Sequence, residues 1–261
     1  MPVRHHRNTQ RESSPRQRIT DPPGRESHQE SAVKAVGITI RPNALLSSER
    51  LLGHPSNGFR DWENRLVVLS ELFPAARVII GFRRQDTALE SMFKHAMAKK
   101  YPGTLEEYIG LKASTRSTTR RESLFQPTDY RSLDYAAIIG GYQLRLGFEN
   151  VLALPFEMLV ETPETFCVTI AECIGGKLQD TGYAAVNTGL SKAGYYYHAF
   201  RHRVGLGAFS FKLIDRIAAR VSGPATPMTK KVHEIVLAHH RSSNERLCEL
   251  VGLDLRRYGY A

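Results

Sequence analysis

An arginine at the end of an apolar run, followed by a serine at helical spacing, is the first feature of this sequence that could do chemistry. The run 77–82 (RVIIGF) has the length and composition of a buried parallel strand, and Arg83 follows it directly. Ser91 comes eight positions later, about a turn inside the helix that the spacing predicts. A guanidinium and a hydroxyl near a helix N-terminus can together bind a phosphate or a similar anion.

The same segment also allows a structural interpretation that needs no ligand. Arg83 and Arg84 stand close in sequence to Asp86 and Glu90, so the arginines can end the strand and form ion pairs with these acids. The spacing alone favours this structural interpretation. Other segments must therefore decide whether the arginine serves a ligand.

Neither of the common glycine-rich phosphate loops occurs in the sequence. The patterns G-x-x-x-x-G-K-[ST] and G-x-G-x-x-G are both absent. Lys177 follows a pair of glycines, but no hydroxyl residue comes next, and the glycines are better explained as the end of a helix. A phosphate site in this protein must be built from other residues.

Strand and helix patterns alternate along the chain. Apolar runs predict strands over 35–40, 77–82 and 151–154, and helical spacing predicts helices over 61–73, 87–99, 135–146, 206–221 and 230–251. Thr104 with Glu107, and Thr162 with Pro163, mark two further helix starts. This alternation predicts an α/β fold in three layers, a mostly parallel sheet with helices on both faces.

Length, charge and cysteine content narrow the class of protein. For the 261 residues we predict a disordered basic tail over 1–34 and one α/β domain over 35–261. The formal charge of +10 favours an anionic ligand. Three cysteines without a CxxC pattern argue against a disulfide framework or a zinc site and favour a cytoplasmic location. No apolar run approaches the roughly 18–20 residues that a membrane span needs.

The segment around Arg83 resembles the sulfotransferase superfamily, whose members use 3′-phosphoadenosine 5′-phosphosulfate (PAPS). In that family a strand ends in an arginine, often followed by x-Gln, and a serine eight positions later joins the arginine on the 3′-phosphate. Arg83, Gln85 and Ser91 match the x-Gln form that many bacterial members have.

Three further segments agree with the resemblance in their order along the chain. The segment 142–163 is similar to the family's tyrosine, turn, strand, Phe-Glu-x-Leu and acidic-x-Pro series, in which we expect Glu157 to be a structural acid beside the strand. The segments 46–50 (LSSER) and 187–191 (NTGLS) resemble two other blocks of bacterial members. The ordered series, over roughly 44–202, is more specific than any single motif.

The resemblance implies a P-loop nucleoside-kinase-like fold and roles for particular residues. Arg83 and Ser91 would bind the 3′-phosphate of PAPS, and Lys192 would contact a phosphate from a late basic loop. Glu49 would be the general base, with His54 as its substitute. The implied reaction moves a sulfuryl group to a hydroxyl of a carbohydrate or small metabolite, without a metal ion.

One family element has no counterpart in the sequence, the Lys-x-Gly-Thr-Thr loop that binds the 5′-phosphosulfate. We therefore expect the first strand-loop-helix unit of the fold to be absent. A truncated or non-catalytic nucleotide-binding relative is accordingly the main alternative to an active enzyme. A basic nucleic-acid-binding protein is the second alternative, supported only by the positive charge and the arginine-rich tail.

Overall fold

The computed structural model describes residues 45–47, 52–53, 59–98, 101, 103–113, 128–178, 195–196 and 226–260. All of them belong to one unit of the chain, 45–261. The predicted tail over 1–34, the strand over 35–40 and the helix over 206–221 lie outside these residues and stay predictions. The main elements are α2 (Trp62–Leu72), β1 (Val78–Phe82), α3 (Gln85–Ala98), α4 (Leu105–Tyr108), α5 (Tyr135–Leu146), β2 (Val151–Pro155), α6 (Phe156–Glu161), α7 (Pro163–Cys173) and α10 (Lys230–Val251).

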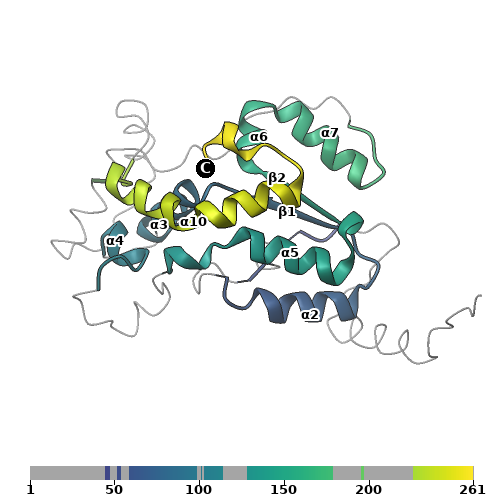
Figure 1. The fold of residues 1–261 in the computed structure, drawn as a ribbon, viewed down its shortest axis with the longest axis horizontal. Helices are drawn as coiled ribbons and strands as arrows, with labels where there is room; N and C mark the ends of the chain where they lie inside the picture. Colours follow the sequence, from purple (N-terminus) through teal and green to yellow (C-terminus); the bar gives the residue numbers. More distant parts are fainter. Residues whose placement is uncertain are drawn as a thin grey trace, which may run out of the picture. The chain divides into compact units, whose positions relative to one another are not determined.

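Two parallel strands form the sheet in the described part of the chain. β1 pairs with β2 so that Phe82 lies opposite Pro155, and the two strands lie side by side in Figure 1. Both strands match their predicted ranges to within one residue at an end. Parallel neighbours need a crossover connection, and helices α3, α4 and α5 occupy it here. Helices around a small parallel sheet agree with the predicted α/β class.

Helix α5 packs against β2, α2 and α10 (Figure 1). Its bounds are those predicted from the apolar spacing. Asp134 caps it by accepting a hydrogen bond from the backbone N–H of Ala137, and Gly147 ends it with a positive φ of 96°. The core between this helix, the strands and α10 is formed by buried side chains that include Ile80, Phe82, Val151, Ala153, Ile139, Tyr142 and Leu247.

Helix α10 connects this core with a second hydrophobic cluster. Thr229 caps its start and Gly252 ends it in the left-handed conformation, which explains why the predicted range 230–251 is the observed one. Val232 and Val236 in its first half pack with α3 and α4, whereas Leu247 in its second half packs with the sheet. One long helix therefore fixes α3 relative to β1.

Two helices near the ends of the strands differ from the prediction. α3 begins at Gln85, two residues before the predicted start, because the carbonyl of Arg84 already accepts the N–H of Ala88. α6 follows Pro155 directly and was not predicted, since it has no side-chain cap and is only six residues long. The capping box of Thr104 and Glu107 and the start of α7 at Pro163 are confirmed. Among the described helices, none is both long and apolar enough to cross a membrane.

Leu247→Ala tests the connection between α10 and the sheet. Because this side chain is fully buried, its truncation should lower the free energy of unfolding by about 2–5 kcal/mol. Urea denaturation followed by circular dichroism measures the change. Leu144→Ala is the matched control, because Leu144 of α5 is 90% exposed and its loss should leave stability unchanged. Equal effects of the two substitutions would contradict the assignment of this core.

Candidate functional site

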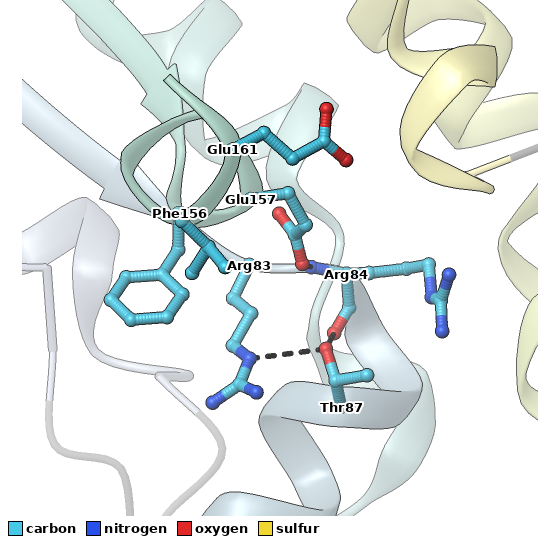
Figure 2. A pocket seen from close by; sticks show the side chains of 7 residues that line it. Arg83, Arg84, Thr87, Phe156, Glu157 and Glu161 are labelled. Atoms are coloured by element: carbon cyan, nitrogen blue, oxygen red, sulfur yellow. Dashed lines mark hydrogen bonds between the residues drawn. The ribbon is translucent and has the colours of Figure 1, made fainter. Parts of the chain in front are cut away.

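An open pocket of about 200 Å³ lies where the carboxyl ends of β1 and β2 meet. Figure 2 shows its lining, which consists of Arg83, Arg84, Thr87, Phe156, Glu157, Val160 and Glu161. Two of these residues directly follow β1, one comes from the first turn of α3, and the others belong to α6. Ligands bind at this edge in open parallel sheets. No group of three metal-ligating side chains occurs in the pocket or elsewhere within the described ranges.

Arg83 presents its guanidinium to the pocket. Its Nε donates a hydrogen bond of 3.2 Å to Oγ1 of Thr87, and its Cζ lies 5.1 Å from the ring centre of Phe156 (Figure 2). The Thr87 hydroxyl in turn donates to the carbonyl of Arg84 at 2.9 Å. Among the residues that the structure describes, the two terminal nitrogens of Arg83 have no hydrogen-bond acceptor. The guanidinium is thus oriented by its neighbours while its outer edge stays available to an anion.

Arg84, by contrast, is used within the fold. Its Nε and Nη2 donate to the two carboxylate oxygens of Asp86 at 2.7 and 3.1 Å, and its Nη1 donates to the carbonyl of Tyr258 at 3.0 Å. Figure 2 shows its side chain extending away from that of Arg83. The structural interpretation from the sequence therefore holds for Arg84 with Asp86. Glu90 pairs with Lys94 of its own helix instead.

Asp86 is buried and bonded from two elements. Besides Arg84, Nδ1 of His233 on α10 lies 2.7 Å from its Oδ2. Burial opposes ionisation of this carboxyl, but the hydrogen bonds and charge of Arg84, with a contribution from His233, outweigh it and hold the pKa of Asp86 below its usual value. The ionised carboxylate links the start of α3 to α10.

Gln85 is buried completely and does not reach the pocket. Its Nε2 donates to Oδ1 of Asn244 at 2.7 Å, and Nδ2 of Asn244 donates to Oε1 of Gln85 at 3.3 Å and to the carbonyl of Tyr260 at 2.6 Å. The residue that matches the family's x-Gln pattern is therefore a structural residue in this chain. Sequence reasoning missed its partner, which lies 159 positions away.

The remaining predicted site residues have different outcomes. Ser91 is exposed on α3, one turn beyond Thr87 on the same face of the helix, but it does not line the pocket. Thr87, which sequence reasoning did not single out, is the hydroxyl that contacts Arg83. The sequence signal for Thr87 was its position four residues before Ser91, which places both residues on one face of a helix. Glu49, His54 and Lys192 lie outside the described residues.

Glu157 accepts hydrogen bonds with both carboxylate oxygens. Its Oε1 accepts the backbone N–H of Arg84 at 3.1 Å, and its Oε2 accepts the hydroxyl of Tyr260 at 2.9 Å. This carboxylate links α6, to which Glu157 belongs, to the turn after β1 and to Tyr260. The arrangement agrees with the structural role that we expect for Glu157 from the sequence.

Comparisons with known proteins bear on the fold. The sequence matches no known protein-family model and no curated protein. The structure is similar to the crystal structure of a sulfotransferase from Alicyclobacillus acidocaldarius, with a TM-score of 0.55 and 16% sequence identity over 93% of this chain and 81% of that chain. At this identity the likeness concerns the fold alone.

Asp86→Asn tests the ion pair beside the pocket. The pKa of Asp86 is lower in the folded protein than its ordinary value of 3.8, so its charge stabilises the fold above that pH and the contribution is lost as the pH falls through the lowered pKa. The substitution should lower the free energy of unfolding by about 3 kcal/mol at pH 7, the lower end for a buried pair because Arg84 keeps partial exposure.

Urea denaturation of both proteins at several pH values measures this effect. The difference between the wild type and Asp86→Asn should shrink below pH 3.8. Glu172→Gln, a substitution at an exposed acid of α7, should leave stability unchanged at every pH. A difference for Asp86→Asn that stays constant from pH 7 to the acid range would contradict the ion pair.

Proposed function

We propose that this protein is a PAPS-dependent sulfotransferase that moves a sulfuryl group to a hydroxyl of a carbohydrate or small metabolite. One observation carries the proposal: in a fold like that of a sulfotransferase, Arg83 offers a guanidinium with free terminal nitrogens, among the described residues, at the carboxyl end of β1. In the proposal Arg83 binds the 3′-phosphate of PAPS. Ser91 joins it from the next turn of α3, and Thr87 keeps the guanidinium in place.

The charges around the pocket favour one anionic group. Arg84 is neutralised by Asp86, whereas Arg83 has no acidic partner among the described side chains. Of the two acids in the lining, Glu157 is held by hydrogen bonds to other elements, and Glu161 lies 3.4 Å from Arg257. Glu157 keeps its negative charge, but both of its oxygens are engaged by donors from other elements. Among the described residues of the lining, Arg83 is therefore the group whose charge and terminal donors remain available to an anion. The Phe156 ring beside Arg83 is 41% exposed and offers a flat surface on which a planar group can stack.

The proposed reaction needs little covalent chemistry from the protein. The acceptor oxygen attacks sulfur, the bond between sulfur and the phosphate oxygen breaks, and 3′-phosphoadenosine 5′-phosphate (PAP) leaves with the electron pair. The acceptor's proton passes to Glu49 in this proposal, and Lys192 contacts a phosphate of the nucleotide. Positioning and charge stabilisation supply most of the rate in reactions of this kind. The same proposal includes the three-layer α/β fold, a mostly parallel sheet flanked by helices that lacks the first strand-loop-helix unit.

Arg83→Ala is the direct test of the anion site. Because the substitution removes a charge-assisted contact to phosphate, it should weaken PAP binding by about 10–100-fold, measured by isothermal titration calorimetry. Arg145→Ala is the matched control, since it removes the same charge from an exposed arginine of α5, next to the opposite ends of the strands. PAP affinity that is unchanged in Arg83→Ala would overturn the proposed site.

Thr87→Val tests whether the threonine hydroxyl orients Arg83. The two side chains have nearly the same shape, but valine cannot accept the hydrogen bond from Nε of Arg83. PAP binding should weaken by roughly 3–10-fold, less than in Arg83→Ala, because the charge remains. An affinity equal to that of the wild type would show that the hydroxyl plays no part.

An assay of PAP release from PAPS with a panel of hydroxyl compounds separates the alternatives. Sulfuryl transfer to any of these compounds supports the proposal that the protein is a sulfotransferase. PAP binding without transfer to any member of the panel would favour the non-catalytic nucleotide-binding relative. Binding to DNA or RNA that weakens steeply with salt, in the absence of PAP binding, would favour the nucleic-acid-binding alternative.

A further inference from the structure

The segment that follows α10 packs against the turn that carries Arg83. A short 3-10 helix (Leu255–Tyr258) leads into Tyr260, which is buried completely. The ring of Tyr260 lies edge-on to Phe82, the last residue of β1, with the ring centres 5.8 Å apart. The carbonyl of Tyr260 accepts a hydrogen bond from Asn244, which in turn pairs with Gln85 at the start of α3. Tyr260 thus contacts Phe82 directly and Gln85 through Asn244, and these two residues stand immediately before and after the pair of arginines in the sequence.

The hydroxyl of Tyr260 contacts Glu157, a residue of the pocket lining. It donates to Oε2 of Glu157 at 2.9 Å, and Oε1 of the same carboxylate accepts the backbone N–H of Arg84 at 3.1 Å. Burial, together with the charge and hydrogen bond of Glu157, raises the pKa of Tyr260. The phenol is thus a permanent donor, and it engages the carboxylate oxygen that Arg84 does not.

Gly259 allows the segment to pass close to Arg84. Its φ of 77° is in the left-handed region, and a Cβ at this position would lie 2.6 Å from Nη1 of Arg84. The carbonyl of the preceding residue, Tyr258, accepts a hydrogen bond from that same nitrogen. The segment 255–260 and the turn after β1 are therefore interlocked.

We infer that Tyr260 is a positioning residue of the anion site, whose hydroxyl keeps Glu157 on the backbone of Arg84 and away from the guanidinium of Arg83. Glu157 and Arg83 line the same pocket, so a carboxylate released from Tyr260 can turn toward the guanidinium of Arg83, whose terminal nitrogens have no acceptor in the described part of the chain. That ion pair would neutralise the charge offered to the ligand. The identity of the ligand rests on the proposed function, whereas the role of Tyr260 in holding Glu157 does not.

Tyr260→Phe tests this role, because phenylalanine keeps the ring against Phe82 and removes only the hydroxyl. Amide hydrogen exchange at Arg84, followed by NMR, should become faster, and PAP should bind about tenfold more weakly. Ser243→Ala is the matched control. It removes a hydroxyl of α10 that also donates to a carboxylate, that of Asp134. The control should leave both Arg84 exchange and PAP binding unchanged, whatever its effect on thermal stability.

A second substitution separates positioning from a general loss of stability. In the double variant Tyr260→Phe with Glu157→Gln, the side chain at position 157 has no charge with which to neutralise Arg83. We therefore expect the double variant to regain most of the PAP affinity that Tyr260→Phe loses, although it lacks the same hydroxyl. A merely structural role would give a double variant that binds as weakly as Tyr260→Phe or more weakly.

The two readouts distinguish the inference from the proposed function. A wild type that does not bind PAP would overturn the proposed function, and Arg84 exchange in Tyr260→Phe would still decide the inference. Unchanged exchange at Arg84 in Tyr260→Phe would overturn the inference, even if PAP binds the wild type. Faster exchange, together with weaker binding that Glu157→Gln restores, supports both.

Discussion

The parallel pairing of β1 with β2 is the constraint on which the pocket depends. Because Phe82 lies opposite Pro155, the residues that follow the two strands meet at one edge although they are 73 positions apart in sequence. The hydrogen bond from the backbone of Arg84 to Glu157 joins them there. A shift of one residue in this register would point the alternate side chains of β1 into the core and would separate the arginines from α6.

Two adjacent arginines have opposite roles because they have different neighbours. Arg84 meets a buried carboxylate and a backbone carbonyl, so its charge and its donors are satisfied within the fold. Arg83 meets a hydroxyl and an aromatic ring, which orient the guanidinium without neutralising it. In the proposed anion site this division lets Arg84 fix the turn while Arg83 would bind the ligand.

Local signals predicted most of the helices and both described strands. The range of α10 follows from the cap at Thr229 and the left-handed Gly252, and the start of α4 follows from its capping box. These signals act over a few residues, so they can be recognised without knowledge of the tertiary structure. The start of α3 was predicted two residues too late and α6 was missed. α3 begins with a backbone hydrogen bond to Arg84 that no residue type marks, and α6 is only six residues long without a side-chain cap.

The sequence by itself determined the class of fold, the strand that ends in two arginines and the resemblance that connects Arg83 with an anion. It did not determine which arginine keeps terminal nitrogens without an acceptor among the described residues, that Gln85 pairs with Asn244, or that Tyr260 reaches Glu157. Those contacts join residues 159 and 103 positions apart. Only the tertiary structure decided them, because a hydrogen bond between buried side chains depends on distance in space, and no local pattern of residue types encodes that distance.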